Sequence, residues 1–220
     1  MNVARGQDGL LSPDRVLHRA VERLAHQFAG MVNAETVDRV VFESYTSLAR
    51  TARVTTHLSS IAEKFARDRL TALAQSRGLL AKPVPEILYV CVQNSGRSQM
   101  AAAITRHIAG ERVHVRSAGS QPSSELLPAV VTVLAEQGID VGDEFPKPLT
   151  DDVVRAADAV VTMGCGDACP LYPGKRYLDW QLNDPGILDL DGVRAVRDEI
   201  RRRVEDLVEE LTAVSSSAAR

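Results

Sequence analysis

The stretch from Cys91 to Ser98, Cys-Val-Gln-Asn-Ser-Gly-Arg-Ser, combines a thiol, a guanidinium and a hydroxyl within one short loop. A continuous apolar run precedes it, which is typical of a buried parallel strand, and a helical pattern follows it. A loop that enters a helix at the carboxyl end of a strand directs several backbone N–H groups at one point, and this attracts a tetrahedral oxyanion. Cys91 can act there as a nucleophile, Arg97 can bind two anion oxygens through its planar fork, and Ser98 can donate a hydrogen bond to the sulfur. The candidate oxyanion-binding residues are Gln93, Asn94, Ser95, Gly96 and Arg97.

A lone cysteine at the end of a strand is more often a small core residue than a nucleophile. The spacing Cys-x5-Arg-Ser between a strand and a helix favours the site instead.

Two further cysteines, Cys165 and Cys169, follow another apolar segment in Met-Gly-Cys-Gly-Asp-Ala-Cys-Pro. If that segment is a strand of the same parallel sheet, both lie at the edge that carries Cys91. Gly164 and Gly166 would allow the backbone there to move a thiol. The pair could exchange disulfides, could be structural, or could bind a metal, although two thiols without further ligands make a poor zinc site. We expect no metal.

The elements that position these residues follow a boundary at 81–85, where two prolines resist both helix and sheet. Apolar runs predict strands at 87–92, 113–115 and 159–162, and periodic patterns predict helices at 98–109, 125–137 and 192–211. Strands that alternate with helices indicate an α/β fold, with a parallel sheet covered by helices on both faces.

The first 80 residues read as helix, with three amphipathic stretches joined by short turns. Ser12-Pro13-Asp14 is a start signal for the first, Asn33 can cap the second, and Thr55 or Thr56 can begin the third. The expected domains are therefore a three-helix bundle over 1–80 and an α/β domain over 86–213. Net charge differs between residues 1–80, at +3, and residues 81–220, at −6. A surplus of +3 is too weak to argue for a nucleic-acid partner.

The chain of 220 residues has an ordinary hydrophobic fraction of 45% and charged fraction of 25%. It contains no apolar run long enough to span a bilayer, so we expect no membrane partner. The first thirty residues lack the pattern of an export signal, and the expected location is the cytoplasm. In that reducing compartment, we do not expect three cysteines to form a structural disulfide framework.

The loop at Cys91 resembles the phosphate loop of low-molecular-weight tyrosine phosphatases, which the arsenate reductases built on that fold share. Asn94-Ser95 followed by Arg97-Ser98-Gln99-Met100-Ala101 is similar to the reductase branch. Further marks of the resemblance are Ser117-Ala118-Gly119, Val160-Val161-Thr162-Met163 and Asn183-Asp184-Pro185. Together they cover about residues 86–212. The resemblance implies a flavodoxin-like parallel sheet, preceded by a three-helix extension that some of these reductases carry.

The resemblance also implies a mechanism. Cys91 attacks arsenate while Asp184 acts as general acid, Cys165 attacks Cys91, and Cys169 attacks Cys165 to move the disulfide outward. No bound cofactor is expected, because an external thiol, thioredoxin or mycothiol with mycoredoxin, would reduce that disulfide. Gly96 stands where many relatives have a second loop cysteine, and the spacing from Cys165 to Cys169 is shorter than in thioredoxin-coupled relatives. Low aromatic content around the site favours a small inorganic anion.

Two alternatives stay open. A low-molecular-weight phosphatase would need only Cys91, Arg97 and Asp184, and an inactive anion-binding module would bind arsenate or phosphate without turnover. The N-terminal helices could form a homodimer interface or a lid. DNA binding is the rival interpretation, against which acidic residues offset the basic residues of the third helix.

Overall fold

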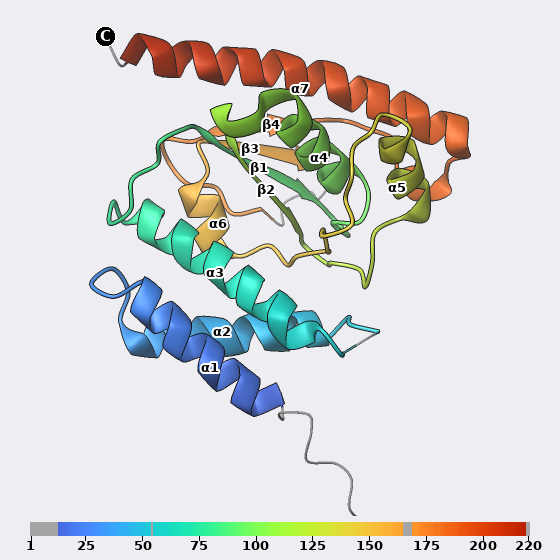
Figure 1. Ribbon diagram of the computed structural model, residues 1–220. Helices are drawn as coiled ribbons and strands as arrows, with labels where there is room; N and C mark the ends of the chain where they lie inside the picture. Colours follow the sequence, from blue (N-terminus) through green and yellow to red (C-terminus); the bar gives the residue numbers. More distant parts are fainter. Residues whose placement is uncertain (1–12, 54, 165–168, 219–220) are drawn as a thin grey trace, which may run out of the picture. The chain divides into compact units, whose positions relative to one another are not determined.

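The structure is a computed structural model that describes residues 13–53, 55–164 and 169–218. Two compact units divide the chain at residues 74 and 75. Figure 1 labels the helices and strands of both. No described helix is long and apolar enough to cross a membrane.

The N-terminal unit consists of the helices α1 (Pro13–Gln27), α2 (Ala34–Ala49) and α3 (Leu58–Ser76). Their buried side chains recur on one face of each helix and include Leu17, Leu24, Phe28, Val37, Val41, Phe65 and Leu70. Asn33 caps α2 by accepting a hydrogen bond from the N–H of Thr36 at 2.8 Å. The predicted helical bundle is confirmed.

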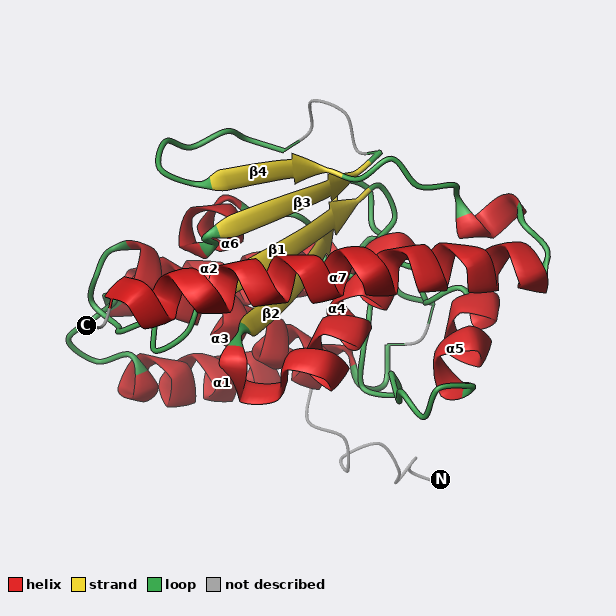
Figure 2. Ribbon diagram, turned by 90° about the horizontal axis from the view of Figure 1, so that it is seen from above, coloured by secondary structure: helices red, strands yellow, loops and turns green. Residues whose placement is uncertain are grey.

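The C-terminal unit contains a parallel sheet in the order β2-β1-β3-β4. The strands are β1 (Glu86–Cys91), β2 (His114–Gly119), β3 (Ala159–Met163) and β4 (Arg176–Asp179). Figure 2 shows this order from above. The register pairs Cys91 with Gly119 on one side and with Met163 on the other. Because parallel strands share a direction, the segments that leave all of them start from one edge of the sheet.

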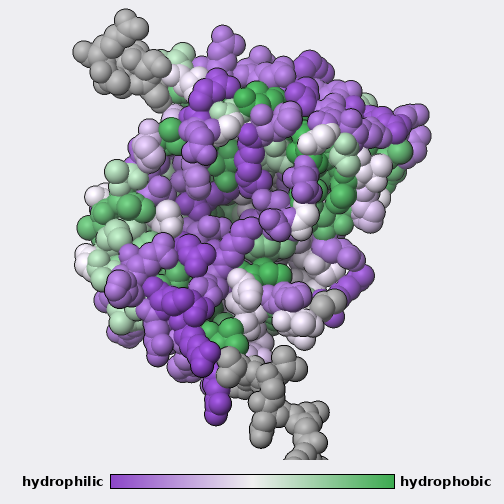
Figure 3. Space-filling view, in the orientation of Figure 1, coloured by the Kyte–Doolittle hydropathy of each residue, from purple (hydrophilic) through white to green (hydrophobic). Residues whose placement is uncertain are grey.

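Helices cover both faces of the sheet, as the sequence predicts. The helices α4 (Arg97–Ala109), α5 (Pro128–Ala135) and α7 (Leu190–Ala218) pack together, with α4 also on β1 and β2. The short helix α6 (Asp151–Ala156) contacts β1 and lies on the opposite face from α4 (Figure 1). The core beneath α4 and α7 is apolar and includes Ile87, Tyr89, Met100, Ile104, Val161, Met163, Val193 and Ile200. The outer surface of α7 is largely hydrophilic (Figure 3).

Several predicted boundaries were wrong. The predicted helix at 125–137 is only α5, because the N–H groups of Ser123 and Leu127 bind the carbonyls of Gln93 and Ser95 instead of forming a helical turn. The predicted strand at 113–115 extends to Gly119. Neither α6 nor β4 was predicted, and short 3-10 turns at 110–112 and 185–187 were also missed.

The amino ends of the strands carry a buried charged cluster. Glu86 is fully buried, and its carboxylate binds His114 at 3.0 Å and Arg116 at 2.8 Å. Burial acts to raise the pKa of Glu86, but the hydrogen bond from His114 and the charge of Arg116 outweigh it and hold the pKa below its usual value. This cluster lies toward the amino ends of the strands, whereas Cys91 lies at the carboxyl end of β1.

Candidate active site

The sulfur of Cys91 lies at the end of β1, where the chain turns toward α4. It is 3.0 Å from the hydroxyl oxygen of Ser98, and the N–H of Asn94 donates a hydrogen bond to it at 3.2 Å. Cys91 is only 2% exposed. The Asn94 amide side chain donates to the Ser98 hydroxyl at 2.8 Å, so the hydroxyl hydrogen is directed at the sulfur.

The carbonyl groups of the loop from 92 to 96 hold it against the segment that follows β2. The carbonyls of residues 92, 93 and 95 accept backbone hydrogen bonds of 2.8, 3.0 and 2.9 Å from the N–H groups of residues 121, 123 and 127. In a trans peptide the N–H points away from the C=O. With these carbonyls turned outward, the loop amides are directed toward the space above the sulfur, as an oxyanion site requires.

Asn94 supports the loop from behind. Its φ of 48° lies in the left-handed region, which asparagine tolerates better than most residues. Its buried side-chain oxygen accepts hydrogen bonds from the backbone N–H of Lys147 at 2.7 Å and from the Gln99 side chain at 3.1 Å. The sequence predicts Asn94 among the oxyanion-binding residues; the structure places its side chain in this buried network rather than among the residues that line the pocket.

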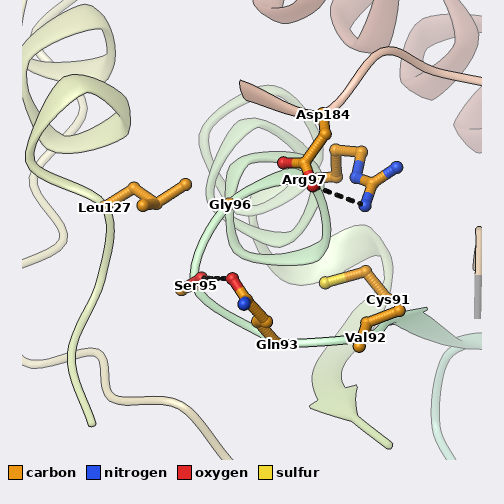
Figure 4. A pocket seen from close by; sticks show the side chains of 8 residues that line it. All are labelled: Cys91, Val92, Gln93, Ser95, Gly96, Arg97, Leu127 and Asp184. Carbon is orange, nitrogen blue, oxygen red and sulfur yellow. Dashed lines mark hydrogen bonds and ion pairs between the residues drawn. The ribbon is translucent and has the colours of Figure 1, made fainter. Parts of the chain in front are cut away.

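A pocket of about 140 Å³ opens above the sulfur. Its lining consists of Cys91, Val92, Gln93, Ser95, Gly96, Arg97, Leu127 and Asp184, none of them aromatic (Figure 4). The Arg97 guanidinium donates to the Leu182 carbonyl at 3.1 Å and lies 3.8 Å from the Asp184 carboxylate. Asp184 is about half exposed, and its other oxygen accepts from the N–H of Gly186 at 3.0 Å. A nucleophile, an anion cradle and a carboxyl group that can exchange protons with water thus share one small cavity.

Two glycines allow close approach around the loop. A Cβ on Gly119 would lie 2.7 Å from the carbonyl oxygen of Val92, a backbone contact that no side chain could relieve. A Cβ on Gly164, which has a φ of +73°, would lie 3.2 Å from the Arg97 guanidinium. The residue that precedes Cys165 therefore lies beside the pocket.

Of the remaining two cysteines, the structure describes only Cys169. Cys165 lies outside the described residues. Cys169 is buried, with its sulfur 3.9 Å from the Pro170 carbonyl oxygen, and it carries no disulfide. The Tyr177 hydroxyl donates to that same carbonyl at 3.1 Å and accepts from the N–H of Tyr172 at 2.8 Å, so β4 anchors this segment at the outer edge of the sheet. Burial first, and then the nearby Cys169, raise the pKa of Tyr177.

The structure thus brings Cys91, Arg97, Ser98 and Asp184 together and places Cys169 along β4. Within the described part of the chain, no group of three or more His, Cys, Asp or Glu side chains is placed to hold a metal. Val92 and Leu127 line the pocket but were not predicted. Pro128 is a signal that could have identified Leu127, because proline favours the first position of a helix and so marks Leu127 as the last residue of the loop.

Comparison with known proteins agrees with this geometry. A cysteine held beneath an anion-binding loop at the first strand of a parallel sheet defines a class of enzymes that act on tetrahedral oxyanions. The low molecular weight phosphotyrosine protein phosphatase family matches residues 86–217, and the protein-tyrosine-phosphatase-like N-terminal domain family matches residues 17–74. The chain belongs to the low molecular weight phosphotyrosine protein phosphatase family.

Three relatives indicate the range of activities. A thioredoxin-dependent arsenate reductase from Corynebacterium glutamicum is 50% identical, with 91% of this chain and 98% of that one covered and a TM-score of 0.82. A glutaredoxin arsenate reductase from Synechocystis is 31% identical over 58% of this chain and 98% of its own length. An arginine phosphatase from Geobacillus stearothermophilus is 27% identical, with 60% and 96% covered and a TM-score of 0.54.

Proposed function

We propose that this protein reduces arsenate to arsenite. The observation that carries the proposal is the position of the Cys91 sulfur, beneath loop amides and in one pocket with Arg97 and Asp184. The 50% identity to a thioredoxin-dependent arsenate reductase over nearly the whole chain favours arsenate over a phosphoester.

In the proposed first step, the loop amides and Arg97 bind arsenate, and the Cys91 thiolate forms a bond to arsenic. One As–O bond breaks, and Asp184, protonated from solvent, gives its proton to the leaving oxygen, which departs as water. Ser98 and the Asn94 N–H donate to the sulfur while it is a thiolate. The result is a Cys91–arsenic(V) adduct.

In the proposed second step, the Cys165 thiolate attacks the Cys91 sulfur. The S–As electron pair goes to arsenic, which leaves as arsenite, and the two thiols become a disulfide. Gly164 supports this assignment, because it lies beside Arg97. Cys169 then attacks Cys165, which frees Cys91 for another turnover. The segment that carries Cys169 is held along β4 by the hydrogen bond from the Tyr177 hydroxyl to the Pro170 carbonyl.

Replacement of Cys169 by Ser tests the relay. One turnover should leave a Cys91–Cys165 disulfide, which mass spectrometry of tryptic peptides identifies. Multiple turnovers at the wild-type rate with thioredoxin would remove Cys169 from the mechanism. Cys91→Ser is the matched control, and it should give neither arsenite nor any disulfide with Cys91.

The proposed reductant is thioredoxin, which the Corynebacterium relative uses. Mycothiol with mycoredoxin and, from the Synechocystis relative, glutaredoxin are the alternatives. Arsenite production with each donor system supplied separately distinguishes them. If Cys165→Ser turns over continuously with mycothiol, the relay of protein thiols is wrong. Mycothiol would then attack the arsenic adduct on Cys91 directly.

A phosphatase is the second candidate function. The pocket contains the nucleophile, the arginine and the acid that a phosphatase needs, and an arginine phosphatase is among the structural neighbours. Hydrolysis of p-nitrophenyl phosphate without arsenite production under any donor would favour it over the reductase.

We also propose a cellular location and a role for the N-terminal unit. We place the enzyme in the cytoplasm, where thiol reductants are available, and assign the helical unit to homodimer formation. Sedimentation of the full chain across a hundredfold concentration range measures the oligomeric state, and a strictly monomeric protein would remove the dimer.

A further inference from the structure

One wall of the pocket is apolar, although its contents are charged. Leu127 lies between Ser95 and α5 and is bound to the loop through its backbone, since its N–H donates to the Ser95 carbonyl at 2.9 Å. Its side chain points toward Gly96 and lines the pocket (Figure 4). A Cβ on Gly96 would lie 3.2 Å from the end of that side chain.

Pro185 packs against Gly96 as well. A Cβ on Gly96 would lie 2.9 Å from the ring of Pro185, which belongs to the turn that carries Asp184. Leu127 also reaches this turn, because its side chain would be 3.9 Å from a Cβ on Gly186. The absence of a side chain at Gly96 thus lets Leu127 and the acid-bearing turn approach each other over the loop.

We propose that Leu127, together with Pro185 over Gly96, determines specificity by restricting this pocket to bare oxyanions and excluding their organic esters. The inference rests on the proposed function and names its substrate class. In displacement at a tetrahedral centre the leaving group departs opposite the nucleophile. Here that direction runs from the Cys91 sulfur toward Asp184 and the wall beside it. Arsenate loses only an oxygen there, whereas an ester must place a whole organic group in that space.

Binding measured at Cys91 tests the inference without turnover. Iodoacetamide alkylates the free thiol, and a ligand in the pocket protects it, so the protection curve gives a dissociation constant. Inorganic phosphate is the bare anion and phenylphosphonate the analogue with an organic substituent. In Leu127→Ala, the ratio of the phenylphosphonate constant to the phosphate constant should fall about tenfold or more, because a shortened side chain in a binding pocket changes discrimination by such factors.

Leu126→Ala is the matched control. Leu126 is the neighbouring residue and loses the same atoms. Both leucines pack against the core, but Leu126 does not line the pocket. Its ratio should equal that of the wild type. An unchanged ratio in Leu127→Ala, or an equal fall in Leu126→Ala, would overturn the inference.

Two additions keep the outcomes separate. If Leu127→Ala does not fold, Leu127→Val should lower the ratio by a smaller factor, and no change there contradicts the proposal. Arsenite production by the same wild-type preparation tests the reductase independently. If the wild type produces arsenite but the ratio is unchanged in Leu127→Ala, only the specificity role of Leu127 is contradicted. If the ratio shifts but no arsenite is produced, the reductase is contradicted and the restriction of the pocket is retained.

Discussion

The hydroxyl of Ser98 offers the most direct test of how the loop controls its sulfur. It is fully buried, accepts from the Asn94 side chain and therefore donates to Cys91 at 3.0 Å. Ser98→Ala removes one of the hydrogen bonds to the reactive sulfur. A hydrogen bond to a charged group contributes about 1.5–3 kcal/mol. About 1.4 kcal/mol corresponds to a factor of ten, but a less stabilised thiolate is also more nucleophilic, with a Brønsted coefficient of about 0.4–0.5. At a pH where the thiol form predominates, alkylation of Cys91 by iodoacetamide should therefore slow roughly fourfold to fifteenfold.

The same substitution leaves the buried Asn94 side-chain N–H without its acceptor, which should lower the free energy of unfolding by about 1–3 kcal/mol. Ser117→Ala is the matched control, because its buried hydroxyl has no hydrogen-bond partner among the described residues. It should leave both quantities nearly unchanged. The assay follows Cys91 and Cys169 peptides in one sample by mass spectrometry.

Wild-type alkylation of Cys91 in Ser98→Ala would refute this account. Equal changes at Cys91 and Cys169 would also do so, because they would indicate general loosening rather than loss of one contact.

Three further predictions follow from backbone crowding, buried charge and the anchor on β4. Gly119→Ala should weaken phosphate binding measured by calorimetry and lower the free energy of unfolding by about 1–3 kcal/mol, because its Cβ would meet a loop carbonyl at 2.7 Å. The pKa of Glu86 is lower in the folded protein than its usual value of 4.5, so its ionised carboxylate stabilises the fold at a pH above 4.5. This stabilisation is lost as the pH falls through the lower pKa of the folded state. Denaturant titrations should therefore show a fall in stability on acidification that is smaller in Glu86→Gln. In Tyr177→Phe, alkylation of Cys169 should accelerate severalfold, because the two hydrogen bonds between the Tyr177 hydroxyl and this segment are removed.

Their controls are equally specific. Gly142→Ala should be mild, since its nearest neighbour is a movable Asp140 carboxylate oxygen at 3.3 Å. If the stability of Glu86→Gln falls with acidification as steeply as that of the wild type, other carboxyl groups cause the fall. Unchanged Cys169 alkylation in Tyr177→Phe, with Cys91 as internal reference, would show that the hydroxyl does not anchor the segment.

The sequence was sufficient for the elements with strong periodicity. The apolar run at β1 and the amphipathic pattern of α4 predicted these elements within one residue at each end, and the start of α7 was predicted within two residues. The end of α7 was wrong, because the helix continues to residue 218 instead of ending at 211. β4 was missed because Arg-Tyr-Leu-Asp is neither an apolar run nor a clear alternation, and its four residues lie at the edge of the sheet. α6 has six residues, too few to show a helical period.

The candidate site was predictable where one segment carries it. Cys91, Arg97 and Ser98 belong to one loop, so their spacing already implied that they meet. The sequence could not show that Leu127 closes the pocket, because that contact joins segments about thirty residues apart in the chain. Nor could it show that the Asn94 side chain lies in a buried network behind the loop, since the hydrogen bond from Lys147 that holds it depends on the path of a distant loop.

The outward carbonyls of the anion loop bear on how this enzyme can be engineered. Backbone N–H groups at 121, 123 and 127 secure the loop, and every amino acid except proline supplies one. Side chains at 121 and 123 can therefore be varied to change the surface beside the loop, with the loss of one side-chain hydrogen bond, from Ser123 to the Glu125 carbonyl. A library that merely omits proline there should yield mostly variants with an intact catalytic loop.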